Sequence, residues 1–248
     1  MPEAPDHSAL AEWRQRLAQA RSVCVLTGAG MSAESGIPTF RDALTGLWSR
    51  FDPARLASVE GFRADPGLVW DWYAERRAGV RAAQPNAGHR ALAAFARRRP
   101  GVLTLVTQNV DDLHQRAGNR DTIRLHGDIL QDRWLEPCGM ACDPARAEPG
   151  RPPRCVACGG LVRPGVVWFG ESLPPAALQH AEHAARHCEV LLVVGTSGAV
   201  WPAAGLAAAA RRAGAHVAIV NPSASEIDAE AHVCLRGTAA ILLPALLD

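Results

Sequence analysis

The stretch Val23 to Asp42, VCVLTGAGMSAESGIPTFRD, decides the fold of this chain. Its first five residues form an apolar run with β-branched members, which is typical of a parallel strand covered on both faces. The run stops at a glycine, and Gly28 to Ala33 fits the pattern G-x-G-x-x-G/A. In that pattern the glycines permit a tight turn and bring backbone N–H groups close to a pyrophosphate. Alone, the pattern favours an ordinary βα turn, and Gly36 and Pro38 forbid a regular helix after it.

The longer string GAGMSAESGIPTFRD resembles the signature of the sirtuins, which are NAD-dependent protein lysine deacylases. The resemblance implies that this loop binds NAD. It places Phe40 and Arg41 on a flexible segment that closes over the nicotinamide ribose. The NAD contacts implied in this stretch are Gly28, Ala29, Gly30, Ser32, Ile37, Phe40 and Arg41.

Composition limits the class of protein. The 248 residues suffice for one sizeable core and a smaller module, and 48% hydrophobic and 21% charged residues are typical of a soluble globular protein. The net charge of +1 gives no global electrostatic reason to expect nucleic acid or an anionic membrane as partner. We find no secretory leader pattern and no apolar run of the roughly 18 residues that span a bilayer. We therefore expect a cytoplasmic protein that needs neither nucleic acid nor membrane.

Residues 44–84 are rich in aromatic side chains and arginines and have no strand pattern, so we predict a helical insertion. Within it, Tyr73 and Arg76 stand at i and i+3 and project from one helix face. A phenol and a guanidinium can together receive a carboxylate, although spacing alone favours a surface Arg beside a half-buried Tyr. Sirtuins that remove malonyl and succinyl groups carry Tyr-x-x-Arg at this place. The resemblance implies that Tyr73 and Arg76 bind the acyl carboxylate and that the small Ala43 leaves room for a longer acyl group.

Two further segments place polar side chains beyond the carboxyl ends of predicted strands, where open α/β sheets bind ligands. The first is TQNVDDLH, residues 107–114, in which an Asn or Asp can also simply cap the next helix. It resembles a sirtuin motif, which assigns Gln108 and Asn109 to the ribose and its water and Asp111 to the nicotinamide carboxamide. The second is His126-Gly127, where the glycine lets substrate approach the imidazole. In sirtuins this His is the general base. The resemblance therefore implies that His126 is catalytic, together with Asn109 at the ribose and its water.

Four cysteines lie close together at Cys138, Cys142, Cys155 and Cys158, with the spacing C-x3-C-x12-C-x2-C. Four thiolates match the tetrahedral coordination of Zn2+, and four protein ligands leave no open position for activating water. We therefore predict one structural zinc ion per chain. The chain also has three histidines on one helix face, His180, His183 and His187, without a supporting carboxylate or cysteine. We predict that they are surface residues.

The segment RPGVVWFGE, residues 163–171, reads as an irregular edge strand, and such an edge can accept an extended peptide through main-chain hydrogen bonds. The alternative interpretation is a core strand whose aromatic side chain is buried in the protein interior. The segment resembles the sirtuin substrate-binding strand, so we assign Val167, Trp168 and Phe169 to substrate.

The remaining NAD contacts rest on the resemblance. It assigns Gly195, Thr196 and Ser197 to a second NAD contact, Asn221 to the adenosine ribose and the backbone of Ala239 to adenine. Many relatives have Glu two positions after the Asn, where this chain has Ser223.

About six βα units with polar loops at the strand ends predict an α/β fold with a doubly wound parallel sheet. We expect residues 1–43, 85–127 and 164–248 to form the Rossmann-like NAD-binding domain. Residues 44–84 and 128–163 would form the helical and zinc parts of a smaller domain, with the site in the cleft between the domains.

The resemblance covers about Val23 to Leu247 and implies an enzyme that uses NAD to remove succinyl or malonyl, and also acetyl, groups from lysines of proteins or peptides. Nicotinamide and O-acyl-ADP-ribose are the implied products. Two alternatives remain. A protein ADP-ribosyltransferase would use the same NAD pocket, and a non-catalytic NAD sensor would bind NAD without releasing nicotinamide. The set of Asn109, Asp111 and His126 speaks against the sensor.

Overall fold

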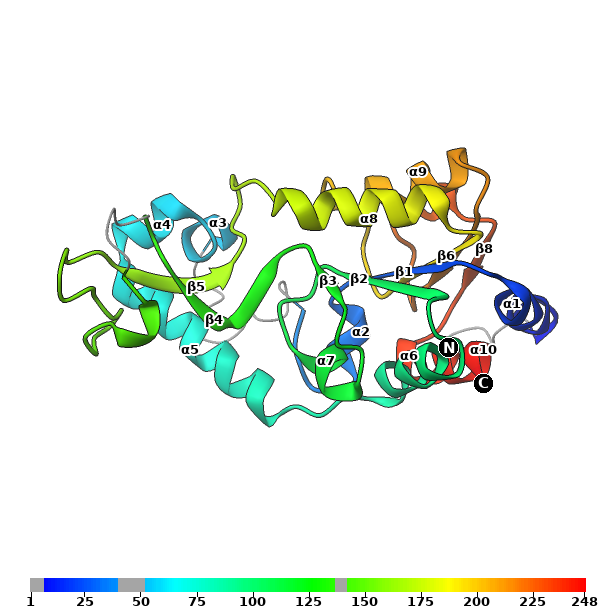
Figure 1. The fold of residues 1–248 in the computed structure, drawn as a ribbon, viewed down its shortest axis with the longest axis horizontal. Coiled ribbons are helices and arrows are strands. Elements are labelled where there is room, and N and C mark those ends of the chain that lie inside the picture. Colours follow the sequence, from blue (N-terminus) through cyan, green and yellow to red (C-terminus); the bar gives the residue numbers. More distant parts are fainter. Residues whose placement is uncertain (1–6, 40–51, 137–141) are drawn as a thin grey trace.

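The computed structural model describes residues 7–39, 52–136 and 142–248. Its main element is a six-stranded parallel sheet with the strand order β3-β2-β1-β6-β7-β8 (Figure 1). The strands are β1 (Val23–Thr27), β2 (Leu103–Thr107), β3 (Ile123–Arg124), β6 (Val190–Val194), β7 (His216–Val220) and β8 (Val233–Leu235). Counted along the chain, this order is 3-2-1-4-5-6, that of a doubly wound dinucleotide-binding sheet. The predicted fold class is confirmed, and β1 lies at its centre.

Helices cover both faces of this sheet, which explains the continuous apolar runs in its strands. One face packs on α1 (His7–Gln19), α6 (Ala87–Arg98) and α10 (Ala239–Leu247), and the other on α8 (Pro175–His187) and α9 (Gly205–Arg212) (Figure 1). Side chains alternate between the faces along β1. Val23 and Val25 join the first core cluster, whereas Cys24 and Leu26 join the second.

A smaller unit lies beside the sheet (Figure 1). It contains α3 (Pro53–Leu56), α4 (Val59–Ala64), α5 (Pro66–Ala82) and the antiparallel pair β4 (Gly127–Trp134) and β5 (Val162–Val166). These elements share a third core cluster, in which Trp72 of α5 packs with Ile129 of β4 and Val166 of β5. The helices of the insertion therefore share one core with β4 and β5, the strands that flank the cysteine-rich segment. The limits of the two domains stay a prediction, and the boundary between residues 163 and 164 falls inside β5.

The helix after the glycine-rich turn is short. It is α2 (Gly30–Ala33), and the chain turns away through Gly36, whose φ of 83° lies in the left-handed region. The other short elements are α7 (Leu113–Ala117) and the 3-10 turns η2 (Pro144–Arg146) and η3 (Asp228–Glu230). Across the described ranges, every helix falls short of the length or the apolar character that crossing a membrane requires.

Candidate functional site

Two glycine-rich loops pack directly on each other at the carboxyl ends of β1 and β6. The Gly28 N–H donates to the Val194 carbonyl at 2.9 Å, and the Gly30 N–H donates to the Gly195 carbonyl at 2.8 Å. A Cβ atom on Gly30 would lie 2.8 Å from the Gly195 Cα, and one on Gly195 would lie 2.4 Å from the Met31 nitrogen. Glycine is needed at these positions because the two backbones approach too closely for a side chain.

A cavity of about 860 Å³ lies between the strand ends and the smaller unit. Twelve of the predicted NAD-binding, catalytic and substrate-binding residues line it, from the glycine-rich loop, α5, the loop after β2 and the segment around β5. Those residues are Ala29, Ser32, Ile37, Tyr73, Arg76, Gln108, Asn109, Asp111, His126, Val167, Trp168 and Phe169. The predicted residues Phe40, Arg41, Ala43 and Cys138 lie outside the described part of the chain.

Asp111 lies at the centre of a buried polar cluster on the cavity wall. The Ser32 hydroxyl donates to the Asp111 Oδ2 at 2.9 Å, and the Asn109 Nδ2 donates to the Ser32 Oγ at 3.1 Å. The Asp111 Oδ1 accepts the N–H of Leu113, the first residue of α7, at 3.0 Å. Burial raises the pKa of Asp111, although these hydrogen bonds and the charge of Arg124 act in the opposite direction. The cluster offers a carboxylate and an amide to a ligand in the cavity.

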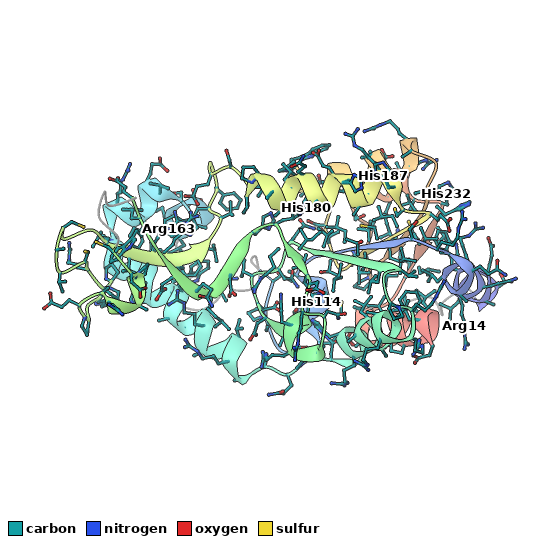
Figure 2. The ribbon with its side chains drawn as sticks, in the orientation of Figure 1. Arg14, His114, Arg163, His180, His187 and His232 are labelled. Atoms are coloured by element: carbon teal, nitrogen blue, oxygen red, sulfur yellow. The ribbon has the colours of Figure 1, made fainter. Side chains whose placement is uncertain are left out.

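Buried hydrogen bonds beneath this cluster hold β1, β2 and α7 together, and our sequence analysis missed them. The Thr27 hydroxyl lies 2.8 Å from the Thr107 hydroxyl and 3.1 Å from the Nε2 of His114, which Figure 2 labels. Burial lowers the pKa of His114 well below its ordinary value, so this imidazole is neutral near pH 7. No pattern in the sequence marks these contacts, because they join segments that are far apart along the chain.

His126 follows β3 and faces the same cavity. Its Nδ1 lies 2.8 Å from the carbonyl oxygen of Gln108. Because a carbonyl only accepts hydrogen bonds, Nδ1 carries the proton, and the neutral ring keeps its lone pair on Nε2. Burial lowers the pKa of His126, partly offset by the bond to Gln108. The ring is therefore held as a neutral base near physiological pH.

Tyr73 and Arg76 reach the cavity from one face of α5, as their spacing predicts. The Tyr73 hydroxyl accepts the indole N–H of Trp168 at 2.9 Å. The guanidinium of Arg76 lies against the rings of Trp72 and Tyr73, with its Cζ 4.7 Å and 5.7 Å from their centroids. Burial raises the pKa of Tyr73 and lowers that of Arg76. This wall thus presents a neutral phenol and a cation.

The rim of the cavity is apolar and exposed. Phe169, which we predicted, is 53% exposed, and Trp201 is 71% exposed. Trp201 lines the cavity together with Val200, and it lies against Gly205, where a Cβ would approach its ring at 2.8 Å. The sequence analysis did not assign Trp72, Glu75 and Glu171 to the site, and the structure adds them to the lining. All three belong to segments that the sequence analysis singled out, residues 44–84 and 163–171, so their position along the chain was the available signal.

The remaining predicted contacts lie outside the lining of this cavity. Gly28, Gly30 and Gly195 hold the loops together, and Thr196 accepts a hydrogen bond from Gln108 Nε2 at 3.2 Å. Ser197 is exposed at the same loop. The Nδ2 of Asn221 donates to the Ser223 carbonyl at 2.8 Å. Ala239 is buried as the first residue of α10. The NAD roles of these residues remain proposals.

Three of the four predicted zinc ligands lie together. The sulfur atoms of Cys142, Cys155 and Cys158 are all within 4.8 Å of one another, and the donor set suits zinc. The Trp134 indole donates to the Cys142 carbonyl at 2.7 Å, which ties the cluster to β4. His180, His183 and His187 are exposed on α8, as predicted, and Figure 2 labels the first and last.

Replacing Cys155 by serine is expected to remove the zinc and to loosen the segment between β4 and β5. A structural metal contributes directly to folding, so the melting temperature should fall by roughly 10 °C. The measurement is zinc content by elemental analysis together with thermal unfolding. Cys188→Ser is the matched control, because this thiol lies outside the cysteine cluster and donates to the Ala185 carbonyl. A full zinc content in Cys155→Ser would contradict the assignment.

Known proteins resemble this chain over most or all of its length. A model described as the Sir2 family matches residues 28–202, more than half of the chain. A chain from Ralstonia nicotianae named NAD-dependent protein deacylase is 56% identical over 248 residues, which cover 100% of both chains. One from Methylococcus capsulatus with the same name is 52% identical over 94% of this chain and 93% of its own.

Solved structures agree in fold. A Sir2 homolog in complex with NAD is 43% identical, has a TM-score of 0.85 and is matched over 96% of this chain and 92% of its own. A Sir2 protein bound to an acetylated peptide is 29% identical, has a TM-score of 0.82 and is matched over 94% of this chain and 95% of its own.

Proposed function

Because the chain belongs to the Sir2 family, we propose that it is an NAD-dependent protein deacylase that acts on acyl-lysine side chains of proteins and peptides. The products are the free lysine, nicotinamide and O-acyl-ADP-ribose. The observation that carries the proposal is that His126, Asn109, Asp111 and the pair of Tyr73 and Arg76 line one cavity.

The donor set of the cavity fits the nicotinamide end of NAD. The carboxylate of Asp111 matches the amide N–H groups of a carboxamide, and Asn109 and Gln108 offer amides nearby. The packed loops around Gly28 and Gly195 would hold the rest of the molecule, at the strand ends where such sheets bind dinucleotides. Bound NAD supplies an electrophilic ribose carbon from which nicotinamide departs.

The residues of the chain position the reactants and move one proton. The exposed rim of Phe169 and Trp201 would receive the peptide, while Val167 and Trp168 line the way to the interior. Nε2 of His126 would accept a proton from a ribose hydroxyl, because its Nδ1 is held by Gln108. The buried wall excludes water, which strengthens the interactions of Asp111 with its ligand.

We propose that the acyl group carries a carboxylate, as succinyl and malonyl groups do. Arg76 provides a cation at the cavity wall, and Tyr73 provides a phenol that stays protonated because burial raises its pKa. A carboxylate placed there would neutralise the half-buried Arg76 and accept hydrogen bonds from both groups. An acetyl group fits the same space but offers no carboxylate for these contacts.

The pH dependence of turnover should report on His126. Its pKa lies below the ordinary value of 6.5, so the ring stays neutral as the pH falls to 6.5. We expect kcat/KM to fall only below pH 6.5, as the pH passes through the folded pKa and Nε2 becomes protonated. An acetyl-lysine peptide should be used, because it carries no carboxylate on the acyl group. An acid limb centred above pH 6.5 would contradict a neutral, buried base.

Mass spectrometry of both products tests the activity itself. A succinyl-lysine peptide incubated with enzyme and NAD should lose the acyl mass, with one nicotinamide released per lysine freed. A mass gain of ADP-ribose on the peptide would instead indicate an ADP-ribosyltransferase, and NAD binding without nicotinamide release would indicate a sensor. The chain contains no lysine, so every acyl-lysine signal comes from the peptide.

We also propose that the enzyme is located in the cytoplasm. In the described part of the chain the six cysteines are free thiols, three of them in the zinc cluster. Free thiols and a thiolate zinc site are usual in reducing compartments.

A further inference from the structure

Arg163 is a buried cation that the proposed reaction does not use. It lies on β5 in the smaller unit, where Figure 2 labels it, and only 1% of its surface is exposed. Its Cζ lies 3.3 Å from the centroid of the Trp168 ring, so the guanidinium stacks directly on the indole. A charge this deep requires partners, because removing it from water is costly.

Those partners hold Arg163 in one orientation. Its two terminal nitrogens donate to Glu171 at 2.6 Å and 3.0 Å, and one of them also donates to the Val166 carbonyl at 2.8 Å. Burial alone would raise the pKa of Glu171, but the bonds from Arg163 and from the Trp168 N–H outweigh it and lower the pKa. Glu171 therefore stays ionised. It also accepts the backbone N–H of Trp168 at 2.8 Å, so the ion pair fixes both the ring and the backbone of Trp168.

Trp168 connects the Arg163–Glu171 ion pair to the cavity wall. Its indole N–H donates to the Tyr73 oxygen at 2.9 Å. Because that oxygen is then an acceptor, the hydrogen of the phenol must point in another direction. A cation over an indole face draws electron density from the ring, and hydrogen bonds in such a chain polarise one another. Arg163 thus acts on Tyr73 without touching the cavity, and its charge also opposes the rise in the pKa of Tyr73.

We propose that Arg163 is a positioning residue for acyl-group selection. Through the face of Trp168, it holds the Tyr73 phenol so that its hydrogen is donated to the carboxylate of the acyl group. This role rests on the proposed preference for carboxylate-bearing acyl groups. It goes beyond the pair of Tyr73 and Arg76 because it assigns part of the selectivity to a buried ion pair behind the wall.

The test measures kcat/KM for two substrates and the NMR signal of the tyrosine in each variant. In Arg163→Met, the ratio of kcat/KM for a succinyl peptide to that for an acetyl peptide of the same sequence should fall about tenfold. Arg163→Lys keeps the charge and should restore part of the ratio. Tyr73 is the only tyrosine in the chain, so protein labelled with 13C at the tyrosine Cζ gives one NMR signal. That signal should move in Arg163→Met.

Arg133→Met is the matched control. Arg133 also pairs with Glu171, at 2.8 Å and 2.9 Å, but its side chain is 44% exposed. Both the ratio and the tyrosine signal should stay as in the wild type. If Arg163→Met fails to fold, Trp168→Phe provides the second variant, because it keeps an aromatic ring beneath the guanidinium and removes the N–H donor to Tyr73. The succinyl-to-acetyl ratio should fall in it as well.

The outcomes of these experiments distinguish a failure of the positioning role of Arg163 from a failure of the proposed preference for carboxylate-bearing acyl groups. A wild-type enzyme that prefers succinyl, with an unchanged ratio in Arg163→Met and Trp168→Phe, overturns the role of Arg163 alone. Equal losses on both substrates, with the tyrosine signal unmoved, would make Arg163 a purely structural residue. A wild-type enzyme that prefers acetyl overturns the proposed acyl class, and the positioning role with it.

Discussion

Combining Tyr73→Phe with Arg76→Met is expected to lower kcat/KM for a succinyl-lysine peptide by about 100-fold. Hydrogen bonds to a charged group each contribute roughly 1.5 to 3 kcal/mol, and about 1.4 kcal/mol corresponds to a factor of ten. Both side chains line the cavity, and Arg76 lies against the rings of Trp72 and Tyr73. Turnover of the acetyl-lysine peptide should change by less than about fivefold, since no carboxylate is lost there. Initial rates measured by mass spectrometry give both values.

The control for this double variant is Arg81→Met. Arg81 lies on the same helix, is exposed and stands outside the cavity lining. It should leave both rates unchanged. Equal losses on the succinyl and acetyl peptides in the double variant would mean that Tyr73 and Arg76 serve the shape of the cavity rather than a carboxylate.

His126→Ala is expected to reduce turnover of every acyl peptide by about 100-fold or more, because general base catalysis typically contributes at least that much. The zinc content should stay at one per chain and the melting temperature should change little. His126 is half-buried and its side chain bonds to the Gln108 carbonyl, whereas its backbone bond to Val167 survives the substitution, so few contacts are disturbed. Nicotinamide release and peptide mass are measured together.

His183→Ala is the control for that experiment, because it removes an exposed histidine on α8, far from the cavity lining. Near-normal turnover in His126→Ala would remove His126 from the base role. A collapse of the melting temperature would make the loss of activity uninformative, so the fold is checked by thermal unfolding first.

The sheet was predictable because its signals are local. The apolar run of the first five residues of the stretch Val23 to Asp42 reflects burial on both faces, and β1 spans these same residues. The polar ends of β2 and β3 placed Asn109, Asp111 and His126 near one another, since parallel strands end at the same edge. The spacing of Tyr73 and Arg76 on one helix face was likewise a short-range property.

The contacts that hold the site were not predictable from the sequence. Arg163 and Trp168 are five positions apart, yet their stacking depends on Glu171, which the turn after Trp168 brings back to both. The hydrogen bond between Thr27 and His114 joins residues 87 positions apart. The glycines of the first loop were expected to face a pyrophosphate, and the structure adds that Gly30 is needed for packing against Gly195. Tertiary packing decides such details, which local patterns do not record.

One competition experiment tests the central claim most directly. The same peptide is prepared in succinyl and acetyl forms, mixed in equal amounts, and incubated with the wild-type chain with and without NAD. We predict that the succinyl form is consumed first, that O-succinyl-ADP-ribose appears, and that nothing is consumed without NAD. Consumption of the acetyl form first would contradict the acyl class assigned to Tyr73 and Arg76. Deacylation without NAD would contradict the proposed activity as a whole.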